Sequence, residues 1–135
     1  MIRKIAALIA GLITSFIVVS LVQVLNGLIF GMMDPNSLGD IEKMRAFVAG
    51  MSAGAFIGLL LSYVLGSVAA GVVMRFISRS SSIVLPMAVG VVGTVTWIYN
   101  VTNIPHPTWV MIAGFFCFVP FVLLGHRLAS GATGR

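Results

Sequence analysis

The sequence predicts an all-α membrane protein: a bundle of four transmembrane helices joined by short loops, with both termini in the cytoplasm. Four long apolar segments follow one another along the 135 residues. Hydrophobic residues make up 59% of the chain and charged residues only 8%. A soluble domain carries about 25% charged residues, because its surface must face water. We therefore expect a single transmembrane domain, residues 1–135, whose surface meets hydrocarbon.

The four predicted spans cover residues 5–30, 46–74, 83–101 and 108–125. As a helix, roughly 20 apolar residues cross a hydrocarbon core of ~30 Å. The last two segments match that length, and the first two are long enough to tilt. The first run is longer than the apolar part of a signal peptide, so we expect it to be retained as a span.

The connections between the spans contain turn and capping signals. Asp34-Pro35-Asn36 predicts a turn, because Asp and Asn bond their own backbone and proline fixes φ. Asp40 is then expected to cap the second helix, which would begin in water with Glu42 in its first turn. Pro120 should interrupt the fourth helix, because proline cannot donate the backbone hydrogen bond.

The orientation follows from the distribution of Lys and Arg, which are enriched in cytoplasmic loops. Two basic residues, Lys43 and Arg45, lie on the side that also carries all three acids. The other side carries six basic residues: Arg3, Lys4, Arg75, Arg79, Arg127 and Arg135. This bias predicts that both termini are cytoplasmic.

Small residues recur at every fourth position of the second span. Such a stripe lets two helix backbones approach closely. Its partner could be another helix of the same chain, with Ala7, Gly11 and Ser15 as the counterpart, or another subunit. The predicted packing residues are Gly50, Gly54, Gly58, Ser62, Gly66 and Ala70.

Polar residues gather at the predicted outer ends of the first and third spans. A buried amide in lipid is unfavourable unless it is hydrogen-bonded, so these groups could fix the register of the helices. The other interpretation is a small outward-facing polar pocket. The candidate residues are Gln23, Asn26, Thr96, Asn100, Asn103 and His106.

Several functional classes lack the residues that they require. No acidic or basic residue lies in the centre of a predicted span, which argues against a proton- or ion-coupled transporter. The two histidines fall on opposite sides and Cys117 is alone in an apolar stretch, so we expect no metal site and no cofactor. No catalytic constellation is present, and we expect a protein that is not an enzyme. The few basic residues form no contiguous patch for nucleic acid.

The chain resembles small four-helix bacterial inner-membrane proteins of uncharacterised function. The resemblance lies in Arg3-Lys4 at the start, in the glycine-rich second span and in the turn from Ile104 to Trp109. It implies a multi-pass location in a bacterial inner membrane.

Two functions remain open from the sequence. The first is a non-enzymatic membrane protein that acts through helix packing, as a homo-oligomer or as a small accessory subunit of a larger complex, with membrane lipids as its other partners. The second is a small transporter or channel that uses the outward-facing polar pocket.

Overall fold

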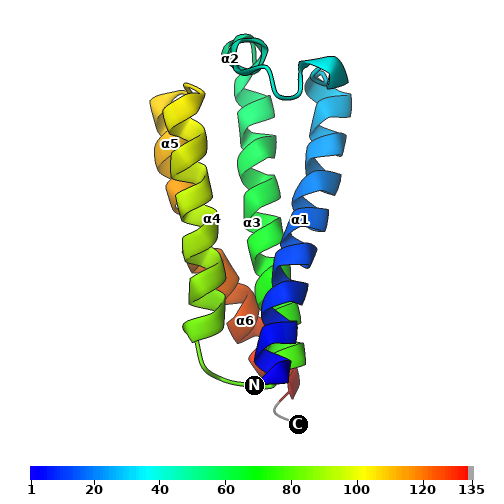
Figure 1. The fold of residues 1–135 in the computed structure, drawn as a ribbon, viewed down its shortest axis with the longest axis vertical. Helices are drawn as coiled ribbons and strands as arrows, with labels where there is room; N and C mark the ends of the chain where they lie inside the picture. The colour runs from blue at the N-terminus through cyan, green and yellow to red at the C-terminus, as the bar shows by residue number, and fades with distance from the viewer. Residues whose placement is uncertain (134–135) are drawn as a thin grey trace.

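The structure, a computed structural model, describes residues 1–133 and is all-α in that range. Four stretches are long and apolar enough to cross a membrane: α1, α3, α4, and α5 together with α6. Helix α1 begins and α6 ends at the same end of the molecule, here called the terminal end, whereas α2 lies across the opposite end (Figure 1). The elements are α1 (Ile2–Phe30), the 3-10 turn η1 (Pro35–Ser37), α2 (Ile41–Ala49), α3 (Ala53–Ser78), α4 (Val84–Asn103), α5 (Thr108–Phe115) and α6 (Val119–Thr133).

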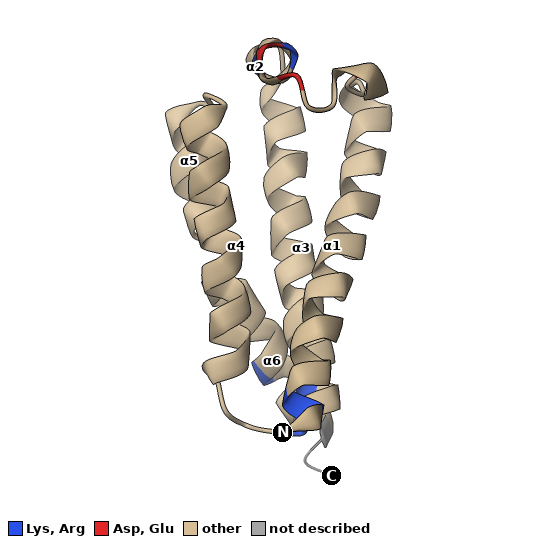
Figure 2. Cartoon of the chain, viewed as in Figure 1, with Lys and Arg blue, Asp and Glu red and all other residues tan. Residues whose placement is uncertain are grey.

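The second predicted span differs from the structure, because residues 46–74 do not form one continuous helix. Asp40 caps α2 as expected, with its carboxylate accepting hydrogen bonds from the backbone N–H groups of Glu42 and Lys43. The helix nevertheless ends at Ala49, and α3 begins at Ala53 after Ser52 accepts a hydrogen bond from the Ala55 N–H. Two capped helices replace one long helix, and the charged residues of α2 stay at the end of the bundle (Figure 2).

The fourth span is interrupted, as Pro120 predicts. Helix α5 ends at Phe115 and α6 begins at Val119, so Pro120 lies in the first turn of α6, where a missing N–H is tolerated. The break separates two packing partners: α5 lies beside α4, and α6 crosses α3 (Figure 1). The span continues to Thr133 rather than ending near residue 125. The first and third spans begin and end within three residues of their predicted limits.

The glycine stripe packs within the chain, mainly against α1. A Cβ placed on Gly66 would lie 2.6 Å from Val19 Cγ2 and 3.1 Å from the Ser15 carbonyl oxygen. A Cβ on Gly54 would lie 2.7 Å from the Phe30 ring, and one on Gly58 would overlap the Asn26 amide.

The rest of the stripe agrees with this packing, except at its first member. Ser62 and Ala70 are fully buried, and the Ser62 hydroxyl donates to the Leu59 carbonyl. On the α1 side, Gly11 faces the side chain of Met74. The prediction that Gly50 is a packing residue of the spanning helix is wrong. Gly50 caps the end of α2, and the break at residues 50–52 separates it from α3.

A second close contact joins α3 to α6 and was not predicted from the sequence. A Cβ on Gly71 would overlap the carbonyl oxygen of Val122, and a Cβ on Gly125 would overlap the carbonyl oxygen of Val68. The two glycines therefore allow the two backbones to touch. This contact lies on a different side of α3 from the stripe and holds the terminal half of the bundle together.

Candidate functional site

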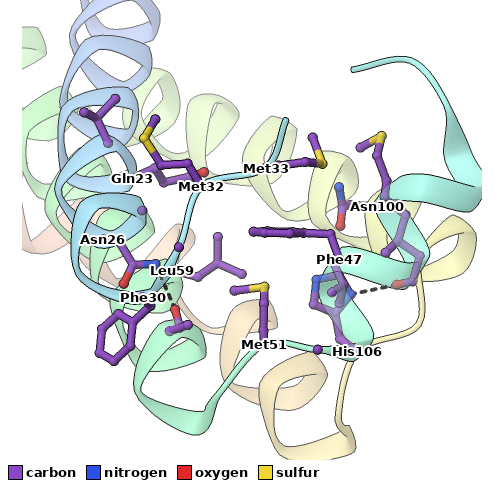
Figure 3. Close-up of a pocket in the computed structure, with 18 of the residues that line it drawn as sticks. Gln23, Asn26, Phe30, Met32, Met33, Phe47, Met51, Leu59, Asn100 and His106 are labelled. Atoms are coloured by element: carbon purple, nitrogen blue, oxygen red, sulfur yellow. Dashed lines mark hydrogen bonds between the residues drawn. The ribbon is translucent and has the colours of Figure 1, made fainter. Parts of the chain in front are cut away.

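A cavity of about 590 Å³ lies between α1, α3 and α4, on the side covered by α2. Figure 3 shows its lining residues drawn from these helices and from the loop around His106. Ligand pockets in proteins typically measure about 300–1,000 Å³, so this volume suits a small molecule. Its lining consists of Ser20, Gln23, Val24, Asn26, Gly27, Phe30, Gly31, Met32, Met33, Met44, Ala46, Phe47, Val48, Gly50, Met51, Ala55, Leu59, Tyr63, Asn100, Ile104 and His106.

The fold brings four of the six predicted polar residues to this cavity: Gln23, Asn26, Asn100 and His106. The other two do not reach it. Thr96 is exposed and its hydroxyl donates to the Val92 carbonyl of its own helix. Asn103 likewise donates to the carbonyl of Tyr99. Both therefore satisfy their polar groups within α4.

Asn26 joins α1 to α3 at the wall of the cavity. Its side-chain Nδ2 donates to the backbone carbonyl of Ala55 at 3.0 Å, in the first turn of α3. The amide lies against Gly58, where no larger residue would leave it room. One turn nearer the terminal end, the Gln23 side chain interacts with the Tyr63 hydroxyl. Asn26 therefore fixes the register of two helices as well as lining the cavity.

His106 is held in one orientation by its neighbours. Its Nδ1 lies 2.7 Å from the Ile104 carbonyl oxygen, and since a carbonyl only accepts, Nδ1 carries the proton. The ring packs edge-on against Trp97 and Phe56, with centroids 5.1 and 6.0 Å away. The other ring nitrogen faces the cavity (Figure 3). In the neutral imidazole this nitrogen is a hydrogen-bond acceptor.

The remaining wall is largely apolar and rich in methionine. Four methionines line it, and the Phe47 ring of α2 extends across it between the Asn26 side and the His106 side (Figure 3). Methionine is flexible and polarizable, and adapts to apolar ligands of different shape. Sequence reasoning missed these residues because it placed them in a loop and in a continuous span. For Met44, the signal in the sequence was the Asp40 cap followed by charged residues, which together indicate a separate short helix. The methionines are Met32, Met33, Met44 and Met51.

Helix α2 is tied to the other side of the cavity by Arg45. Its Nε donates to the Asn103 carbonyl oxygen at 2.9 Å, and its Nη1 donates to Glu42 Oε1 at 3.0 Å. The first bond connects α2 to the last residue of α4. Arg45 thus holds α2 over the cavity, on the side of α4.

The cavity ends about halfway along the bundle. Its deepest lining residues on α1 and α3 are Ser20 and Tyr63. From Phe30 to Ser20, ten residues of helix span about 15 Å. Towards the terminal end, Gly66 meets Ser15, and Gly71 meets Val122, so the helices close against one another. The cavity therefore lies at the α2 end only.

No Asp, Glu, Lys or Arg side chain is among the described residues that line the cavity. Within residues 1–133 no three His, Cys, Asp or Glu side chains are grouped so that they could hold a metal ion. The polar groups of the cavity are neutral amides, hydroxyls and one imidazole. Such groups orient an uncharged ligand by hydrogen bonds.

The chain matches no protein-family model, no curated protein and no solved structure. Its likeness to small four-span membrane proteins consists of the four long apolar helices. The described part of the chain is all-α, with four helical stretches long and apolar enough to cross a membrane and a cavity at one end.

Proposed function

We propose that this protein is a non-enzymatic membrane protein that binds a small, uncharged amphipathic molecule in the cavity covered by α2. One observation supports this most directly: an apolar cavity of about 590 Å³ carries a few neutral polar groups on opposite walls. A ligand with an apolar body and a neutral polar group matches that lining. An ionic ligand does not, because no side chain there offers a compensating charge.

The polar groups suggest how the ligand is oriented. Asn100 and the second ring nitrogen of His106 offer donors and an acceptor on the α4 side of the cavity, and Gln23 offers an amide on the α1 side. The methionines and Phe47 would contact the apolar part. Phe47 must move aside for a ligand to fill the space that its ring crosses (Figure 3).

The proposed setting is a bacterial inner membrane with α2 on the outer face. The basic residues of the terminal end support this orientation through the enrichment of Lys and Arg in cytoplasmic segments. Among the six basic residues used for this argument, Arg135 lies outside the described residues. In this orientation the cavity receives its ligand from the outer side, as one state of a small transporter or as a binding protein.

The other function, assembly through the glycine stripe, has less support. The stripe faces α1 of the same chain at Gly54, Gly58 and Gly66, and is not available to another subunit there. A homo-oligomer or a larger complex would need a different surface. We therefore base the proposed function on the cavity and not on the glycine stripe.

The test uses a photoactivatable fatty alcohol, which is uncharged and amphipathic, on the full chain in lipid nanodiscs. Labelled peptides are mapped by mass spectrometry for the native chain, for Asn100→Trp and for the control Thr96→Trp. Both positions are on α4 one turn apart, but only Asn100 lines the cavity. We expect labelling within residues 23–51 to fall about tenfold in Asn100→Trp, equivalent to ~1.4 kcal/mol of binding free energy.

Thr96→Trp should label like the native chain. Excess unlabelled fatty alcohol should suppress the cavity labelling and leave labelling of the lipid-facing helix surfaces unchanged. The proposal is wrong if the probe labels all exposed apolar positions evenly and neither substitution changes the pattern.

A further inference from the structure

A partly buried arginine, two of whose nitrogen atoms have no hydrogen-bond partner, lies at the terminal end of the molecule, far from the cavity. Arg75 is in the last turn of α3 and is only partly exposed. Its Nε and Nη1 atoms are buried and form no hydrogen bond within residues 1–133. A buried cation is unfavourable unless it is paired, because its lost hydration is not replaced.

No acidic side chain of the chain can pair with Arg75. The sequence has three, Asp34, Asp40 and Glu42, and all lie at the α2 end (Figure 2). The terminal end carries further cations, among them Arg79 and Arg127. No acidic side chain of the chain therefore balances the positive charge of this end.

Helix α6 and the loop after α3 lie close to Arg75. Gly71, one turn earlier on the same face of α3, lies against α6, where an added Cβ would be 2.7 Å from the backbone nitrogen of His126. His126 is only 3% exposed and lies near the backbone of Ser80 and near Arg75, which is an unfavourable neighbour for a second cation and not a partner. Arg75 therefore lies near α6 and near the loop that leads to α4.

We propose that Arg75 binds a phosphate group at this end of the bundle. Guanidinium N–H groups form charge-assisted hydrogen bonds with phosphate oxygens. The last turn of a membrane-spanning helix is also the depth at which lipid phosphates lie, and basic pockets between such helices bind phospholipid headgroups. A phospholipid headgroup and a free phosphate share this chemistry, and the experiment separates the two sources.

The experiment measures binding by native mass spectrometry of the full chain released from detergent. The probes are phosphatidylglycerol, diacylglycerol as the lipid without phosphate, and inorganic phosphate. The variants are Arg75→Gln and the control Arg127→Gln, an exposed arginine at the same end. The native chain should bind phosphatidylglycerol in preference to diacylglycerol. Arg75→Gln should lose roughly tenfold or more of that affinity, and Arg127→Gln less than about twofold.

Competition assigns the source of the phosphate. If millimolar inorganic phosphate displaces the lipid from the native chain but has no such effect on Arg75→Gln, the site takes a free phosphate group. If it does not displace the lipid, the site takes a phospholipid headgroup. Equal losses in Arg75→Gln and Arg127→Gln, or no preference for phosphatidylglycerol over diacylglycerol, would overturn the proposal.

A second variant covers the case in which Arg75→Gln does not fold. Arg75→Lys keeps the charge but replaces the planar set of donors by a compact ammonium. We expect about threefold weaker binding of phosphatidylglycerol together with an unchanged melting temperature without added lipid. Native affinity in Arg75→Lys would contradict the role of the guanidinium.

Discussion

Gly71 and Gly125 have the tightest backbone environment in the bundle. At each of them an added Cβ would overlap a carbonyl oxygen of the facing helix, so the neighbour cannot rotate away as a side chain could. At Gly11 or Gly54 the obstacle is instead the flexible side chain of Met74 or the ring of Phe30. The loss of stability caused by a Gly→Ala substitution should therefore depend on whether the added Cβ meets backbone or a flexible side chain.

We predict that Gly71→Ala lowers the free energy of unfolding by roughly 1–3 kcal/mol, because overpacking must separate α3 from α6. Gly131→Ala is the matched control on α6, since nothing lies within 4 Å of its added Cβ and alanine favours helix. Thermal unfolding of both variants in the same detergent gives the comparison. Equal melting temperatures for Gly71→Ala and the native chain would show that the two backbones do not touch.

A substitution of Asn26 tests whether a polar residue of the cavity also stabilises the packing of α1 against α3. Asn26→Leu removes the hydrogen bond to the Ala55 carbonyl between α1 and α3. Hydrogen bonds between membrane helices average about 0.6 kcal/mol and reach ~1.7 kcal/mol, and we expect a loss within that range. Thr96→Val should be close to neutral, because its bond stays within α4. Denaturant unfolding in mixed micelles measures both changes, and an equal loss in the two variants would contradict the register role.

At the scale of elements, the sequence predicted what local chemistry determines. Asp40 as a cap and Pro120 as an interruption follow from groups within one turn of the break. The end of α2 at Ala49 was missed because the run from Ala46 to Met74 is mostly apolar. A hydropathy pattern does not show where one helix ends and the next begins in another direction. Ser52, a capping residue inside an apolar run, was the local signal for the start of α3.

Helix α2 should be mobile when its link to α4 is removed. Arg45→Gln breaks the bond from Nε to the Asn103 carbonyl, whereas Lys43→Gln removes only an ion pair at 3.9 Å within the same segment. An exposed hydrogen bond contributes about 1 kcal/mol, so amide exchange in α2 should accelerate roughly fivefold in Arg45→Gln. Hydrogen exchange read by mass spectrometry over residues 41–49 measures this. Equal exchange in the two variants would mean that Arg45 does not hold α2 over the cavity.

For the whole molecule, the sequence predicted the number of long apolar helical stretches but not which helices touch. Segment length and composition determine that number, because a helix needs roughly 20 apolar residues to cross the hydrocarbon core. The partner of the glycine stripe was left open, since spacing shows that a helix face is small without showing what covers it. The cavity depends on the bond from Arg45 of α2 to Asn103 and on the packing of His106 against Phe56, and both contacts join residues distant in sequence.

The orientation in the membrane is the last prediction, and it follows from charge alone. Six basic residues on one side and two on the other should place the terminal end in the cytoplasm. In a Cys117→Ser background we would introduce Asn36→Cys at the α2 end and Ser81→Cys in the loop before α4. Both positions are exposed. A membrane-impermeant maleimide should label Asn36→Cys in intact cells, and Ser81→Cys only after permeabilisation. The reverse labelling pattern would show the opposite orientation, with the cavity at the cytoplasmic side and Arg75 at the outer leaflet.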